Sequence, residues 1–177
     1  MTRLISQGSV VADRWTLLRD ATTLADLPDG APAIVPLALW LRHRAALIAR
    51  GEVGVLLGPA DEPGAIAPDL GWIPVIAVDF PQFTDGRGYS EARLLRERHG
   101  YVGELRAVGD VARDQLCLLG QVGFDSFALP GERDLGAALA GLADFSDGYQ
   151  SAYRRTPWYR RRTAAAAPVG AVPPPCA

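Results

Sequence analysis

The chain has 177 residues, of which 49% are hydrophobic and 21% charged, proportions typical of a globular protein. All of its basic residues are arginine, and it has only two histidines and two cysteines. This composition excludes lysine Schiff-base chemistry, a GxxxxGK[ST] phosphate loop and a four-thiolate or three-histidine zinc site, so we expect no metal and no cofactor. The first ten residues lack a signal-peptide pattern and no apolar run is long enough to cross a membrane, which predicts a cytoplasmic protein.

The charge is unevenly distributed along the chain. All 20 acidic residues lie at or before Asp147, whereas five of the 18 arginines follow it. This asymmetry predicts one domain over residues 1–150 and a tail over 151–177, with an acidic domain that disfavours nucleic acid as a partner. Such a tail is expected to dock on its own domain or on an acidic partner.

The N-terminal segment predicts a β-hairpin. Ser9–Val11 and Trp15–Leu18 have strand-forming sequences, and the three residues Ala12, Asp13 and Arg14 between them are suited to a turn. The polar segment 20–32 is then expected to be a connection, because prolines and a glycine interrupt it.

From residue 33 onward, short apolar runs alternate with helical patterns. Strands are predicted over 33–37, 53–57, 75–79, 104–108 and 124–129, and helices over 37–48, 90–99, 110–122 and 134–144. Ser90 and Asp110 are predicted helix caps. This repetition predicts an α/β fold with a mostly parallel sheet of βα units, either an open sheet or a partial (β/α) barrel.

In such folds the site lies at the C-terminal ends of the strands, where the loop 80–90 is the longest. We predict a small-oxyanion site there, with Asp85 as a candidate catalytic base and these ligand-binding candidates: Arg87, Gly88, Tyr89, Arg106, Asp110 and Asp114. The alternative is an ordinary loop in which Arg87 pairs with Asp85. Residues 86–91 begin like a dinucleotide-binding fingerprint, but Glu91 occupies the position of its third glycine.

Glu104 and Arg106 alternate on a predicted strand, so their side chains leave the same face. One interpretation is a polar pocket with Asp79 and Asp110 at its rim, in which Glu104 is a second candidate catalytic base. The other is a structural ion pair. The residues favour neither interpretation.

The tail combines aromatic residues with arginines, a composition typical of protein-interface hot spots. The predicted partner-binding residues are Arg154, Arg155, Trp158, Tyr159 and Arg160. Beyond residue 162 the chain is rich in alanine and proline, and we expect most of the tail to be disordered.

Several stretches, among them 79–81, 85–90, 103–107, 109–111 and 123–125, resemble a bacterial family of unknown function whose members are often labelled oxidoreductases. The similarity runs over roughly residues 1–147. The resemblance implies a gene neighbourhood of assimilatory sulfate reduction, beside sulfite reductase. The expected function is therefore an accessory protein of sulfate and sulfite reduction that binds a reductase or its electron donor. The alternative is an oxyanion-binding enzyme or oxidoreductase that acts on a sulfur species.

Overall fold

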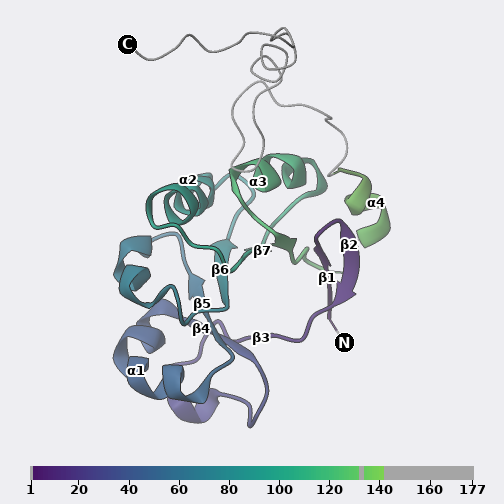
Figure 1. Ribbon diagram of the computed structural model, residues 1–177. Helices are drawn as coiled ribbons and strands as arrows, with labels where there is room; N and C mark the ends of the chain where they lie inside the picture. Colours follow the sequence, from purple (N-terminus) through teal and green to yellow (C-terminus); the bar gives the residue numbers. More distant parts are fainter. Residues whose placement is uncertain (1, 132–133, 142–177) are drawn as a thin grey trace, which may run out of the picture.

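Eight strands form one sheet in the computed structural model, which describes residues 2–131 and 134–141 (Figure 1). The strands lie in the order β2-β1-β8-β7-β6-β5-β4-β3. Their bounds are β1 Arg3–Ser6, β2 Ser9–Ala12, β3 Thr16–Leu17, β4 Ala33–Pro36, β5 Val53–Leu57, β6 Val75–Phe80, β7 Glu104–Gly109 and β8 Ser126–Phe127. Strands β3 to β8 pair in parallel, whereas β1 pairs antiparallel with both β2 and β8. The sheet is therefore mixed, and the prediction of a mostly parallel sheet is corrected.

Helical segments connect the successive parallel strands from β4 to β8. The α-helices are α1 Leu37–Arg50, α2 Arg87–Arg93, α3 Leu116–Val122 and α4 Leu135–Gly141. A π-helical turn, η3 Leu94–Arg98, continues α2, and 3-10 turns form η1 Leu24–Asp26, η2 Pro63–Asp69 and η4 Arg113–Gln115. The predicted repeated βα units are therefore present, and they form a curled half-barrel.

The N-terminal hairpin exists, but its strands are not the predicted ones. β2 pairs with β1 around a turn at Gln7 and Gly8, whose positive φ angles of 49° and 74° suit a tight hairpin. The predicted second strand instead contributes β3, which pairs with β4 at the opposite edge of the sheet. The segment Ala12–Arg14 is therefore not a hairpin turn.

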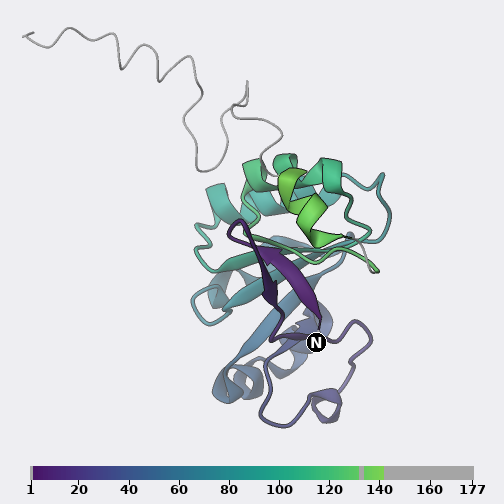
Figure 2. The same cartoon turned by 90° about the vertical axis from the view of Figure 1, so that its right-hand side faces the viewer.

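The short link 13–15 shows that the sheet is curled. It joins β2 at one edge to β3 at the other, and so few residues span at most about 14 Å even when fully extended. An eight-stranded sheet can bring its edges so close only by rolling up, as Figures 1 and 2 show. The link crosses the concave side of the sheet and carries Asp13 and Trp15 into it.

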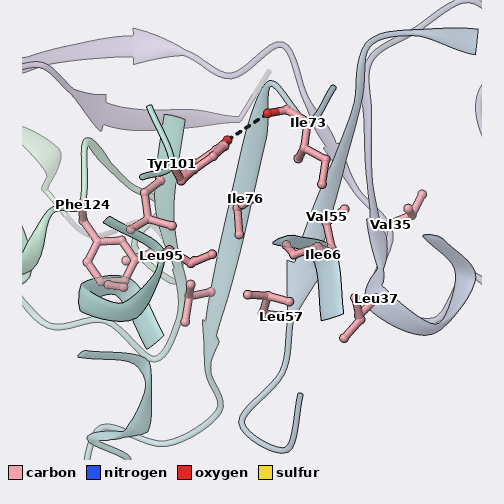
Figure 3. Packing of buried hydrophobic residues seen from close by; sticks show 14 of the residues in the cluster. Val35, Leu37, Val55, Leu57, Ile66, Ile73, Ile76, Leu95, Tyr101 and Phe124 are labelled. Carbon is pink, nitrogen blue, oxygen red and sulfur yellow. Dashed lines mark hydrogen bonds between the residues drawn. The ribbon is translucent and has the colours of Figure 1, made fainter. Parts of the chain in front are cut away.

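Apolar side chains cover both faces of the sheet. The helix-facing core joins strand residues such as Val55, Leu57 and Ile76 to helix residues such as Leu95 (Figure 3). On the concave face, Trp15 packs in a smaller cluster with Ile34, Leu56, Val75, Ala77 and Val108. Burial on both faces explains why these strands read as continuous apolar runs.

Two helices begin at other residues than predicted. The helix predicted from Asp110 begins only at Leu116, after the short turn η4. The predicted α2 cap, Ser90, lies inside a helix that begins at Arg87.

Among the described helices, none is long and apolar enough to cross a membrane. The tail 151–177, with its predicted disorder and its partner-binding residues, lies outside the described residues.

Candidate functional site

Most of the predicted site residues gather at the C-terminal ends of β6 and β7. Asp85, Arg87, Gly88 and Tyr89 surround the start of α2, and Asp110 and Asp114 follow β7. Two hydrogen bonds tie these segments together, because the Phe83 amide donates to Asp110 Oδ2 at 3.1 Å and Gln115 Nε2 donates to the Phe83 carbonyl at 3.2 Å. Asp110 thus fixes the loop after β6 instead of capping a helix.

Arg87 and Asp85 form the ion pair that was the alternative to an oxyanion site. Arg87 Nε and Nη2 donate to the two carboxylate oxygens of Asp85 at 2.9 and 2.6 Å, and the Arg87 amide donates at 3.1 Å. The Arg87 side-chain hydrogen bonds hold the pKa of Asp85 below its usual value. An anionic ligand would therefore have to displace Asp85 from a two-pronged pair.

Gly88 and Tyr89 have packing roles at this site. A Cβ atom at Gly88 would lie 2.6 Å from Cζ of Phe80, so glycine lets α2 approach the ring closely. Tyr89 meets the same ring edge-on, with centroids 5.6 Å apart. Burial raises the pKa of the Tyr89 hydroxyl, and the charge of Asp114 adds to that effect.

Glu91 is the residue here whose importance the sequence analysis missed. It is 7% exposed, and its Oε2 atom has no hydrogen-bond partner among the described residues. Its pKa is raised to about 7, chiefly by burial, with Asp61 and Asp85 also raising it and Arg87 lowering it. The helical period was an available signal, because Glu91 falls on the same buried side of α2 as Gly88 and Ala92.

The mouth of the concave face carries a second ion pair. Asp79, near the end of β6, lies 2.6 Å from Arg19, which follows β3. The pair reaches from β6 past β5 and β4 to the chain after the edge strand β3. Among the described residues, no three histidine, cysteine or acidic side chains are placed to hold a metal ion.

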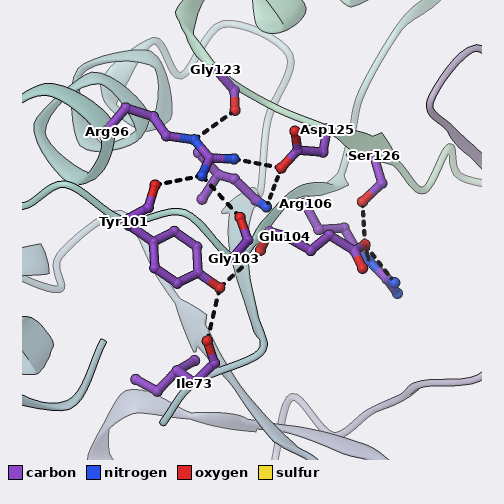
Figure 4. A network of polar contacts seen from close by, with 10 residues as sticks. Ile73, Arg96, Tyr101, Gly103, Glu104, Arg106, Gly123, Asp125 and Ser126 are labelled. Carbon is purple, nitrogen blue, oxygen red and sulfur yellow. Dashed lines mark hydrogen bonds and ion pairs between the residues drawn. The ribbon is translucent and has the colours of Figure 1, made fainter. Parts of the chain in front are cut away.

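Glu104 and Arg106 share a face, as the alternation predicts, and they form a structural ion network (Figure 4). Arg106 Nε and Nη2 donate to Glu104 Oε1 at 2.9 and 2.8 Å, and Nη1 donates to both oxygens of Asp13 at 2.9 Å. Ser126 Oγ also donates to Glu104 Oε1. Arg106 therefore does not join Arg87, because it lies under the link 13–15 at the other end of the strands.

A buried arginine holds the N-terminal ends of β7 and β8 together. Arg96, in the π-helical turn, donates to the carbonyls of Gly123, Tyr101 and Gly103 and to the Asp125 carboxylate (Figure 4). Asp125 in turn accepts a bond from the Leu105 amide at 2.9 Å. The π-helical turn has no sequence signature, so this network could not be predicted.

Two exposed apolar residues flank this network. Trp72 precedes β6 and is 67% exposed, and Val102 precedes β7 and is 88% exposed. The Tyr101 hydroxyl donates to the Ile73 carbonyl at 3.1 Å, which holds the two segments side by side (Figure 3). We call Trp72 and Val102 the apolar pair.

The outer side of α2 also carries an open groove of about 460 Å³. It is lined by Ser90, Arg93, Leu94, Glu97 and Arg98. None of the predicted ligand-binding residues lines it, so it is separate from the candidate site.

Comparison with known protein families identifies the family of this chain. A sequence model described as bacterial protein of unknown function (DUF934) matches residues 54–159, more than half of the chain. The chain belongs to this family. A search of the curated proteins gives no match.

The DUF934 match covers the sheet from β5 to β8 and the intervening helices. It contains Glu91, Arg96 and the apolar pair, whereas Asp13 and Arg19 lie before it. It also extends into the tail as far as Tyr159, beyond the stretch in which the sequence resembles the family. The candidate site and the apolar pair thus both lie in the family segment.

Proposed function

We propose that the protein is an accessory protein of assimilatory sulfate and sulfite reduction that binds a reductase or its electron donor. The apolar pair is the observation that carries the docking role. Tryptophan is among the side chains most enriched in interface hot spots, and Trp72 is two-thirds exposed. The sulfur pathway rests on the gene neighbourhood that the family resemblance implies.

The backbone beneath the apolar pair is well suited to docking. Arg96 holds the Tyr101 carbonyl at 2.7 Å, and Tyr101 holds the Ile73 carbonyl through its hydroxyl. Two buried contacts therefore fix the segments that present Trp72 and Val102. A fixed surface loses little conformational entropy on binding, which favours affinity.

The alternative, an enzyme or oxidoreductase acting on a sulfur oxyanion, receives less support from the geometry. Arg87 and Arg106 were its anion-binding candidates, and carboxylates already neutralise both of them. Both arginines would have to exchange a charged partner for the ligand. We therefore place partner binding first.

The test is binding of the full chain to the sulfite reductase of the same operon, followed by calorimetry or native mass spectrometry. Trp72→Ala is expected to weaken the complex by about 30-fold or more, the effect of losing a hot spot. Phe83→Ala is the matched control, because Phe83 is 47% exposed and follows the C-terminal end of β6. It should bind as the wild type does.

Two results would contradict the proposal directly. One is a wild type that forms no complex with the reductase or its electron donor, and the other is a Trp72→Ala variant that binds unchanged. Sulfite binding that Arg87→Ala abolishes, in a protein that forms no complex, would favour the oxyanion alternative. A flavin absorbance spectrum in the purified protein would favour the oxidoreductase alternative.

A further inference from the structure

Glu91 is a buried carboxyl group whose hydrogen bonding is incomplete. It lies on the inward side of α2, and Oε2 has no partner among the described residues. A buried polar atom without a partner costs free energy, and an ionised carboxylate costs much more than a neutral carboxyl. The proton on Glu91 therefore decides how well α2 packs here.

The charges that face Glu91 come from two directions. Asp61 lies in the loop after β5, where its Oδ2 accepts a bond from the Gly58 amide at 2.7 Å. Asp85 and Arg87 flank the start of α2 and neutralise each other. The Asp61 carboxylate is the further negative charge that acts on Glu91, so an ionised Glu91 is repelled by Asp61.

We propose that Glu91 is a proton-controlled latch that keeps the start of α2 packed against the end of β6, where Gly88 lies close to Phe80 and Val78. The neutral carboxyl stays buried on the inward side of α2. When the proton leaves to solvent, the carboxylate is driven toward water, and the start of α2 loosens from β6. The latch lies at the C-terminal ends of β5 and β6, where α/β proteins bind their ligands.

The direction of the pH effect follows from the two states of the latch. The pKa of Glu91 rises from 4.5 to about 7 in the closed state, chiefly through burial. The closed state therefore binds the proton more tightly than an open state in which Glu91 meets water. Stabilisation by the latch is complete below pH 4.5, falls as the pH rises toward 7 and is lost above it. The open population should rise roughly tenfold between pH 6 and pH 8.

Amide hydrogen exchange on the full chain tests the latch. Between pH 6 and pH 8, after correction for intrinsic exchange rates, protection of residues 87–93 should fall roughly tenfold, while protection of β7 stays unchanged. Glu91→Gln keeps the side-chain shape without an ionisable proton, and it should abolish the change. Glu97→Gln is the matched control, because Glu97 is an exposed partner of Arg93, and it should behave as the wild type.

Two outcomes would overturn the latch. One is an equal loss of protection in Glu91→Gln and in the wild type, and the other is no loss in the wild type. The titration of the Glu91 side-chain carbon, followed by NMR in the wild type, provides a measurement that needs no variant. A midpoint near 7 is expected, and a midpoint below 5 would refute the proposal.

Discussion

Replacing Arg96 with methionine should be among the most destabilising single changes in the described part of the chain. The Arg96 side chain is fully buried and donates to three carbonyls and to Asp125, which it meets in an ion pair. Methionine fills similar space but leaves these acceptors without their donor. Removing one partner of a buried, hydrogen-bonded pair costs about 3–5 kcal/mol. That is a large share of the about 5–15 kcal/mol by which a domain is stable.

Urea unfolding measures this loss. With a slope of about 2 kcal/mol per molar, the midpoint should fall by about 1.5–2.5 M. Arg93→Met is the matched control, because Arg93 lies one turn earlier, pairs with Glu97 at 2.9 Å and is half exposed. An exposed pair of this kind contributes less than about 0.5 kcal/mol. If Arg96→Met lowers the free energy of unfolding by less than about 1 kcal/mol, the Arg96 network is not the main contact that holds the N-terminal ends of β7 and β8 together.

If Arg96→Met does not fold, a gentler cycle keeps the reasoning testable. Arg96→Lys retains the charge but cannot reach the acceptors with a planar fork, so an intermediate loss is expected. Combined with Asp125→Asn, it should show a coupling energy of about 1 kcal/mol or more, since the two side chains share one contact. Additive losses would show that Arg96 acts through the carbonyls instead of through Asp125.

Two further predictions concern Asp69 and Gly88. Burial alone would raise the pKa of Asp69, but hydrogen bonds from Arg44 and Trp40 and the Arg44 charge outweigh it and hold the pKa below 3.8. The ionised Asp69 stabilises the fold above about pH 4, and this stabilisation is lost as the pH falls through the lowered pKa. Between pH 5 and pH 2 the wild type should therefore lose more free energy of unfolding than Asp69→Asn does. Equal losses for the two proteins in urea unfolding would contradict this. Gly88→Ala should cost about 1–3 kcal/mol, because its Cβ would lie 2.6 Å from the Phe80 ring. Gly86→Ala is the control for thermal unfolding, since no atom lies within 4 Å of its Cβ, and equal melting temperatures for the two variants would refute the clash.

The parallel strands could be predicted from sequence because their signal is local. Val53–Leu57 carries no polar side chain and lies between Glu52 and Gly58, and β5 has these bounds. The shared face of Glu104 and Arg106 follows in the same way from the period of two. What lies opposite that face could not be predicted, because Asp13 reaches Arg106 from 93 residues away. The choice between a pocket and an ion pair therefore required the structure.

The errors have the same physical origin. Trp15–Leu18 has strand propensity, and a nearby turn made a hairpin the natural local solution. Tertiary pairing instead sends this segment across the curled sheet to β4, and it leaves Trp15 in the concave core. At α2, Glu91 does not fit the glycine pattern of a dinucleotide-binding loop, but the helical spacing places it on the buried side with Gly88 and Ala92.

The two ends of the parallel strands differ in how completely their buried polar groups are satisfied. At the N-terminal ends, both terminal nitrogens of Arg96 and of Arg106 have hydrogen-bond partners. These bonds hold this end of the sheet rigid, so it can present the apolar pair without reorganisation. At the C-terminal ends, Glu91 keeps an unpartnered oxygen and faces Asp61. Because the length of β6 separates Glu91 from Trp72, ionisation of the latch should leave partner docking unchanged. Failure of the docking proposal would therefore leave the latch standing, and failure of the latch would leave the docking surface intact.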